Sequence, residues 1–215
     1  MEWLRDPDEI YRRSFAIVAE EADLFAVPED MQDVAIRLVH ACGMLDIFAD
    51  LRWSDGAAAA ARDALASGAP VICDAQMVAD GVIAARLPAD NQILSMIRLP
   101  NVAEMAKELG TTRSAAQVEL WKPFLPGSVV AIGNAPTALF RLLEIIAEDL
   151  SRMPAAILGF PVGFVGARES KDALHEDGHD VPYITLLGRR GGSAMASAAV
   201  NALAGQYEKL SLIHI

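Results

Sequence analysis

The chain has 215 residues, of which 53% are hydrophobic and 22% charged, and its formal net charge is −11. This length suits one domain with a sizeable core, and the apolar share excludes an intrinsically disordered chain. The acidic balance argues against non-specific binding to nucleic acid and against docking on an anionic membrane surface, because both attract basic proteins.

Cellular location is inferred from segments that the sequence lacks. No apolar run approaches the roughly 18 residues that a membrane-spanning helix needs, and the first residues lack the basic and apolar regions of a secretory signal. Two cysteines, Cys42 and Cys73, do not make a disulfide framework. We therefore expect a cytoplasmic protein with reduced thiols. No linker divides the chain, so residues 1–215 are expected to form a single domain.

Three helices are predicted before the first strand. Asp6 can cap a helix that begins with a proline and extends to about residue 23, because its carboxylate can accept hydrogen bonds from free N–H groups. A second helix is predicted over residues 28–43, where Gly43 is typical of a helix end. The third lies between residues 54 and 68. The chain therefore opens with an N-terminal helical segment.

Short β-prone runs then alternate with helical patterns. The runs are continuously apolar, which is typical of strands covered on both faces. Strand–helix alternation with glycine-rich turns predicts an α/β fold with a mostly parallel central sheet flanked by helices. The predicted strands are 71–73, 93–97, 129–132, 156–158 and 183–186, and the predicted helices are 101–109, 112–121, 135–150, 166–175 and 192–205.

Glycine-containing turns follow three of the predicted strands, where ligands bind in folds of this class. N–H groups at the start of the next helix can bind an anion. The turn at 132–140 is as consistent with an ordinary connection as with such a site. At 159–171 a close-packed turn is somewhat favoured over a phosphate cradle. At 188–195 the paired Arg189 and Arg190 suit a carboxylate or phosphate, and a solvated basic turn is equally consistent.

One histidine stands out among four. His40 lies in an apolar helical stretch, where a lone histidine is more often a core residue with its polar atoms satisfied. Arg37 precedes it by one helical turn and points the same way, and Gly43 ends the helix soon after. These neighbours favour a position that faces a pocket. Imidazole titrates near neutral pH, so His40 is the natural candidate for a proton donor or acceptor.

Other chemistries find little support. No histidine pair has the spacing of a zinc-protease motif and the two cysteines lie far apart, so we predict no metal site. The thiols occur in apolar sequence and are interpreted as inert. His175 and His179 are expected in an exposed loop. The dinucleotide fingerprint and the serine-hydrolase elbow are absent, so we expect no nucleotide cofactor and no serine nucleophile.

Taken together, several segments resemble the precorrin-8X methylmutase family of cobalamin biosynthesis, including its cobalt-precorrin-8 counterpart. Their order and spacing across nearly the whole chain make the resemblance specific. Residues 206–215 have no counterpart in it, and no role is assigned to them. The segments are IYRRSFAI at 10–17, VHACG at 39–43, GAPVICD at 68–74 with Met77-Val78, TRSAA at 112–116, SVVAIGNAPTALF at 128–140, and the turns at 159–171 and 188–195.

The resemblance implies a Rossmann-like α/β subunit that works as a homodimer, with its active site at or near the subunit interface. It implies an isomerase that moves a methyl group from C-11 to C-12 of precorrin-8X and yields hydrogenobyrinic acid without a cofactor. Two alternatives stay open. One is a cobalt-precorrin-8 methylmutase of the anaerobic route, and the other is a tetrapyrrole-binding protein without activity. A nucleotide-dependent Rossmann enzyme is disfavoured by the missing fingerprint.

The resemblance also implies roles for four residues. His40 falls on the catalytic histidine, which is proposed to protonate the macrocycle and so promote migration. Ser14 falls on a serine that contacts substrate, and Arg113 matches a basic residue of the site. Arg37 is a further candidate for substrate binding. The physics agrees, because a methyl shift within the ring forms no bond to the protein, while the ring's carboxylates require arginines. We therefore expect an acidic exterior around a locally basic site.

Overall fold

The computed structural model describes residues 3–205, so residues 206–215 lie outside the described part. The first two helices match their predicted spans closely. Helix α1 (Pro7–Glu21) is capped by Asp6, whose carboxylate accepts the N–H of Asp8 at 3.0 Å. Helix α2 (Glu29–Cys42) ends at a glycine in the left-handed conformation, φ 69°. The capping residues read from the sequence therefore mark both helices correctly.

A six-stranded sheet forms the centre of the molecule, in the order β1-β6-β5-β4-β2-β3. All neighbouring strands are parallel except β1, which runs antiparallel to β6 at the edge. The predicted α/β class with a mostly parallel sheet is confirmed. The strands are β1 (Leu51–Trp53), β2 (Val71–Cys73), β3 (Ile93–Ser95), β4 (Val129–Ile132), β5 (Ala156–Gly159) and β6 (Tyr183–Leu186).

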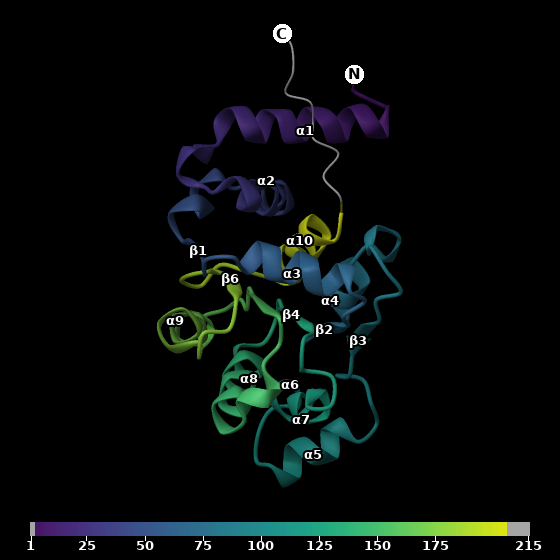
Figure 1. Cartoon of the computed structure of the whole chain (residues 1–215), viewed down its shortest axis with the longest axis vertical. Helices are drawn as coiled ribbons and strands as arrows, with labels where there is room; N and C mark the ends of the chain where they lie inside the picture. The colour runs from purple at the N-terminus through teal and green to yellow at the C-terminus, as the bar shows by residue number, and fades with distance from the viewer. Residues whose placement is uncertain (1–2, 206–215) are drawn as a thin grey trace.

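Helices cover both faces of the sheet (Figure 1). Helices α10, α3 and α4 lie on one side, with α2 outside α10 and α1 outermost, while α8, α9, α6, α7 and α5 lie on the other. None of the helices in residues 3–205 is long and apolar enough to span a bilayer. The remaining α-helices are α3 (Ala57–Ala66), α4 (Gln76–Gly81), α5 (Val102–Glu108), α6 (Arg113–Ala116), α7 (Val118–Trp121), α8 (Pro136–Glu148), α9 (Ala167–Asp177) and α10 (Ser193–Ala204), and the 3-10 turns are η1 (Leu24–Ala26), η2 (Leu45–Ala49), η3 (Ala84–Arg86) and η4 (Leu150–Arg152).

Three details differ from the sequence prediction. Strand β1 was not predicted, because it has three residues and exists only through its pairing with β6, where Leu51 lies opposite Leu186. Helix α4 is a six-residue helix that the pattern did not reveal. The single helix predicted over 112–121 is two short helices joined at Gln117, whose buried amide donates to the backbone oxygen of Asp74 at 2.6 Å.

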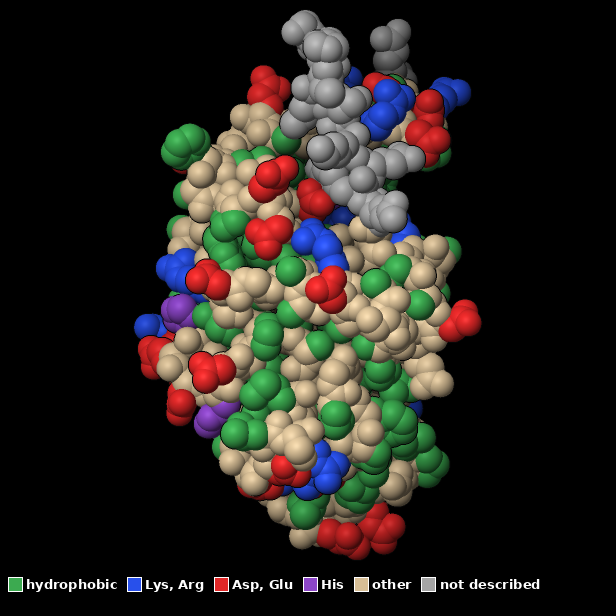
Figure 2. All heavy atoms as spheres, in the orientation of Figure 1, with side chains coloured by type: hydrophobic (Ala, Val, Ile, Leu, Met, Phe, Trp, Pro, Cys, Tyr) green, Lys and Arg blue, Asp and Glu red, His purple; other side chains and the backbone are tan. Residues whose placement is uncertain are grey.

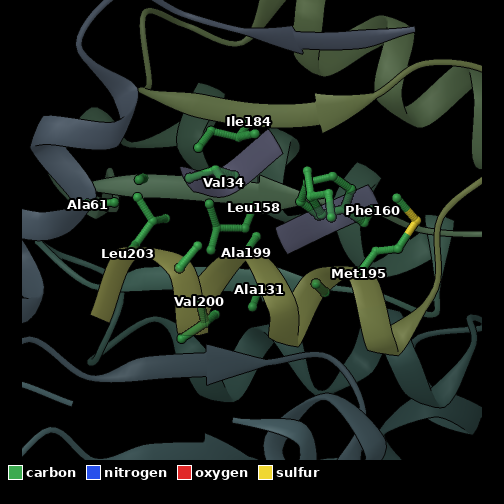
Figure 3. Close-up of a cluster of buried hydrophobic side chains, with 14 of the residues drawn as sticks. Val34, Ala61, Ala131, Leu158, Phe160, Ile184, Met195, Ala199, Val200 and Leu203 are labelled. Atoms are coloured by element: carbon green, nitrogen blue, oxygen red, sulfur yellow. The ribbon is translucent and has the colours of Figure 1, made fainter. Parts of the chain in front are cut away.

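Helix α10 occupies the middle of the larger core. It is buried on nearly all sides because it lies between the sheet and α2, so its residues are mostly small and apolar. Ala199, Val200 and Leu203 of this helix belong to the same buried cluster as Ala131 of β4 and Leu158 of β5 (Figure 3). A second apolar cluster fills the opposite face of the sheet beneath α7 and α8.

A buried carboxylate joins the ends of two neighbouring strands. Asp74 follows β2 and is fully buried, and its oxygens accept the N–H groups of Gly133, Asn134 and Ala135 at 2.8, 3.0 and 2.7 Å. Burial raises the pKa of Asp74, while these backbone hydrogen bonds oppose the rise. The sequence allowed the turn at 132–140 to bind an external anion. Its first N–H groups instead bind the protein's own carboxylate.

We expect Asp74→Ala to lower the free energy of unfolding by about 3 kcal/mol, because three backbone N–H groups would lose a charged acceptor. Urea denaturation followed by circular dichroism measures this loss. Asp80→Ala is the matched control, since it removes an exposed carboxylate from α4 and should cost less than about 0.5 kcal/mol. Equal losses in the two variants would mean that the buried carboxylate does not stabilise the strand ends.

Candidate active site

The two predicted residues Ser14 and His40 lie in direct contact. Ser14 belongs to α1 and His40 to the last turn of α2, and the two helices pack against each other. The Oγ of Ser14 is 2.8 Å from Nδ1 of His40, a hydrogen bond between residues 26 positions apart. His40 is half-buried. The imidazole therefore has a fixed orientation while part of its surface stays accessible.

Two aromatic side chains of α1 flank the imidazole. The ring centroid of Phe15 is 4.8 Å from that of His40, and the ring centroid of Tyr11 is 5.3 Å away. Sequence reasoning did not single out either residue as part of the site. Their spacing contained the signal, because Tyr11, Ser14 and Phe15 stand at i, i+3 and i+4 on one helix face. Once Ser14 is placed in the site, the other two necessarily follow.

Arg37, one turn before His40 on α2, lies beside the same aromatic rings. Its guanidinium carbon lies 5.1 Å above the centroid of the Phe15 ring, and the side chain interacts electrostatically with Tyr11. Burial lowers the pKa of Arg37, and the nearby positive charge of Arg86 lowers it further. The guanidinium remains charged at neutral pH, because an arginine pKa starts far above 7.

Arg86 enters the site from a third part of the chain. It ends η3, and its guanidinium carbon lies 6.0 Å from the centroid of the Tyr11 ring, on the outer limit for a cation–π contact. No pattern in the sequence distinguishes this arginine from others in loops. Only the packing of η3 beside α1 brings it to Tyr11. We name the side chains of Tyr11, Ser14, Phe15, Arg37, His40 and Arg86 the His40 cluster.

The surroundings of His40 favour its neutral form. Burial lowers the pKa of His40 below its ordinary value, and the charge of Arg37 lowers it further. Ser14 occupies Nδ1, and within the described residues no hydrogen-bond partner joins Nε2. The second ring nitrogen therefore makes no hydrogen bond to the described part of the chain.

The fourth predicted residue, Arg113, does not join this cluster. It is the first residue of α6, on the opposite side of the sheet from α1 and α2 (Figure 1), and its side chain is exposed. The preceding Thr112 caps the helix through Ala115 and hydrogen-bonds the hydroxyl of Thr137 at 2.8 Å. Within one chain, the predicted site residues thus divide into a group of three and a separate arginine.

The other two glycine-containing turns border an open hollow of about 390 Å³, lined in part by Asp50, Arg168 and Arg189. Arg190 is held by the carboxylates of Asp46 and Asp50 at 2.7 and 2.6 Å, so its charge is already paired. Arg189 instead stacks on the exposed ring of Phe164, with its guanidinium carbon 5.2 Å from the centroid. The side chains that line the hollow therefore include both acidic and basic groups.

The remaining nucleophilic and metal-ligating types take no part in the His40 cluster. Cys73 is buried, and burial raises the pKa of its thiol. His175 was expected in a loop, but it lies exposed on the last turn of α9, with Nδ1 2.6 Å from the hydroxyl of Tyr183. Among residues 3–205, no group of three histidine, cysteine or acidic side chains is arranged to hold a metal ion.

Comparisons with known proteins agree on one family. A sequence model of the family described as precorrin-8X methylmutase matches residues 9–206. A precorrin-8X methylmutase of Pseudomonas aeruginosa is 55% identical to 97% of this chain and is covered over 100% of its length. One of Sinorhizobium sp is 53% identical, with 94% of this chain and 96% of the relative covered. A cobalt-precorrin-8 methylmutase of Leptospira interrogans is 34% identical, with coverages of 90% and 91%.

A solved structure supports the same conclusion. It is a precorrin-8x methyl mutase from Thermus thermophilus that superimposes with a TM-score of 0.81. Its sequence is 37% identical, and the match covers 91% of this chain and 95% of that one. Fold and sequence therefore point to the same group of proteins.

We expect the imidazole of His40 to titrate below pH 6.5 in an NMR experiment, with its signal assigned from the His40→Asn variant. Arg37→Met should raise the midpoint, because it removes a positive charge that disfavours the imidazolium. Since the folded-state pKa is lowered, this group stabilises the fold fully above pH 6.5 and loses that contribution as pH falls through the folded pKa.

Arg168→Met serves as the control for this titration, since Arg168 lies on α9 across the sheet and is mostly exposed. It should leave the His40 midpoint unchanged. A wild-type midpoint at or above 6.5, or the same midpoint in wild type and Arg37→Met, would contradict the electrostatic description of the site.

Proposed function

Because the chain belongs to the precorrin-8X methylmutase family, isomerases of cobalamin biosynthesis, we propose that it moves the methyl group from C-11 to C-12 of precorrin-8X and that His40 handles the proton. The product of this reaction is hydrogenobyrinic acid. The observation that carries the assignment of His40 is its 2.8 Å hydrogen bond to Ser14 beside the rings of Tyr11 and Phe15. We place the enzyme in the cytoplasm, where it needs no disulfide.

The cobalt-free substrate is favoured over its cobalt-containing counterpart. Two relatives named for precorrin-8X share 55% and 53% of their residues with this chain, whereas relatives named for cobalt-precorrin-8 share between 30% and 39%, with 34% for that of Leptospira interrogans. The Leptospira relative aligns over 91% of its own length, so its lower identity is not caused by partial coverage. The closer sequence relationship therefore supports precorrin-8X as the substrate.

His40 acts as an acid that becomes protonated when the substrate binds. In the free protein its pKa is lowered, so the imidazole is neutral near pH 7. The acetate and propionate groups of the tetrapyrrole carry negative charge, and an opposite charge nearby favours the imidazolium. Substrate binding therefore raises the proton affinity of His40, and Nε2 is the nitrogen that faces away from Ser14. One proton delivered from Nε2 to the conjugated ring shifts its electron density and assists migration. The imidazole is then neutral and takes a proton back from the ring once the methyl group has moved, so substrate and product remain isomers.

The neighbours of His40 position rather than react. Ser14 holds Nδ1, which fixes the ring plane and directs Nε2 outward. Tyr11 and Phe15 supply apolar surface for a macrocycle and lower the local dielectric, which strengthens charge interactions in the site. This built arrangement favours an enzyme over a tetrapyrrole-binding protein without activity, because simple binding does not require an oriented imidazole.

We assign Arg113 to the site of a second copy of the chain. Within one protomer Arg113 and His40 are on opposite sides of the sheet, so one chain does not bring both to the same substrate. In a twofold dimer each residue of the interface meets the partner's surface. The exposed guanidinium of Arg113 is free to bind a ring carboxylate beside the partner's His40. The proposed functional unit is therefore a homodimer with two composite sites.

We expect His40→Ala to keep the fold and to bind hydrogenobyrinic acid, while kcat falls by about 10²- to 10⁴-fold because an acid–base group is lost. The conversion of precorrin-8X is followed by the change of its absorption spectrum to that of hydrogenobyrinic acid. His175→Ala is the matched control, because it removes an exposed histidine from α9. If the wild-type protein leaves the precorrin-8X spectrum unchanged, the proposed function is wrong. If the His40→Ala variant is as active as the wild type, the proposed role of His40 is wrong.

We expect two inactive variants, His40→Ala and Arg113→Ala, to regain activity when they are unfolded together and refolded as mixed dimers. Each mixed dimer has one site that lacks both side chains and one that is intact. Statistical assembly then restores about a quarter of wild-type activity. Refolding each variant alone is the control. Retention of full activity by Arg113→Ala, or no recovery in the mixture, would place the whole site within one protomer.

A further inference from the structure

Two guanidinium groups in the His40 cluster converge on one side chain. The guanidinium of Arg37 lies 5.1 Å above the ring of Phe15 and interacts electrostatically with Tyr11, and the guanidinium of Arg86 lies 6.0 Å from the centroid of the Tyr11 ring. The charge of Arg86 also acts on Arg37 and lowers its pKa. The two cations therefore repel each other across Tyr11, an arrangement that costs free energy in the empty protein.

Neither cation is neutralised by an ion pair within the part of the chain that the structure describes. The salt bridges of residues 3–205 include neither Arg37 nor Arg86. Asp33, one turn before Arg37, attracts it electrostatically but pairs with Arg62 at 3.8 Å. A bound anion between the two guanidiniums would therefore remove their repulsion and gain two charge-assisted interactions.

The segment that carries Arg86 is fastened to α10 by one side chain. Asn201 is 7% exposed, and its Oδ1 accepts the N–H of Ile83 at 2.8 Å while its Nδ2 donates to the oxygen of Gly81 at 2.9 Å. Gly81 packs closely on the same helix, since a Cβ there would lie 2.5 Å from Oγ of Ser197. These contacts fix the chain three to five residues before Arg86.

We propose that Arg37 and Arg86 together bind one carboxylate of the tetrapyrrole and that Asn201 is the positioning residue that holds Arg86 in place. The proposal rests on the proposed function, because the ligand it names is the substrate of that reaction. The subsite lies next to the rings of Tyr11 and Phe15, which also contact His40. A carboxylate anchored there fixes which edge of the macrocycle faces Nε2.

The carboxylate chemistry follows from the donors. A guanidinium presents planar pairs of N–H groups that match two carboxylate oxygens, and Arg37 and Arg86 supply such donors from two directions. The neighbouring rings of Tyr11 and Phe15 are suited to an apolar ring system rather than to a small hydrated anion. A large ligand that combines an aromatic ring with acidic side chains satisfies both parts of the subsite.

The first experiment measures the binding of hydrogenobyrinic acid by absorption titration. Arg86→Ala should raise the Kd about tenfold, since a charge-assisted contact is lost, and Arg86→Lys should recover part of the affinity. Raised ionic strength should weaken the wild type more than Arg86→Ala. Lys107→Ala is the control for net charge, because Lys107 is exposed on α5 at the far end of the molecule and should leave the Kd unchanged.

The second experiment separates positioning from simple stability. Asn201→Ala should raise the Kd toward the value of Arg86→Ala, and the double variant should bind no more weakly than Arg86→Ala alone. Asn91→Ala is the matched control, since the Asn91 amide also donates two hydrogen bonds to backbone oxygens, those of Leu65 and Ala69. It should lower the free energy of unfolding without changing the Kd.

The outcomes distinguish this inference from the proposed function. Wild-type protein that fails to bind hydrogenobyrinic acid contradicts the function itself. Wild-type binding with an unchanged Kd in Arg86→Ala overturns the subsite alone. Additive losses of affinity from Arg86→Ala and Asn201→Ala, or an equal loss in Asn91→Ala, overturn the positioning role of Asn201 and leave the arginine pair in place.

Discussion

The burial of α10 between the sheet and α2 is the constraint on which the rest of the structure depends. Its mostly small side chains allow the helix to contact strands on one side and α2 on the other, and its apolar residues join a buried cluster with those of β4 and β5 (Figure 3). Helix α2 is held in place by α10, and α1 packs on α2. The position of the His40 cluster, which α1 and α2 carry, therefore depends on α10. The same helix holds the Arg86 segment through Asn201.

The His40 cluster departs from the usual placement of sites in parallel α/β folds. Ligands commonly bind beyond the carboxyl ends of the strands, where N–H groups at helix starts are free. Here the N–H groups that follow β4 bind Asp74, and Arg190 after β6 is paired with two aspartates. The cluster is instead built between α1, α2 and η3. The geometry of the His40 cluster thus depends on helix packing outside the sheet.

The distribution of charge reconciles an acidic protein with an acidic ligand. The formal net charge is −11, and acidic side chains occur from one end of the molecule to the other on the face drawn in Figure 2. Around His40 the local balance is reversed, because Arg37 and Arg86 converge on Tyr11 and belong to none of the ion pairs of the described residues. Binding responds to the local field, whereas net charge describes the whole surface.

By itself the sequence determined most of the elements and singled out three residues that the fold brings together in the His40 cluster. Helix ends, five strands and the parallel class follow from local periodicity and capping, and the pairing of Ser14 with His40 agrees with residues singled out in advance. Only tertiary structure decided the edge strand β1, the arrival of Arg86 at Tyr11 and the separation of Arg113 from His40. The physical reason is range: periodicity and capping act within a few residues, whereas these three features depend on contacts between segments far apart in the chain.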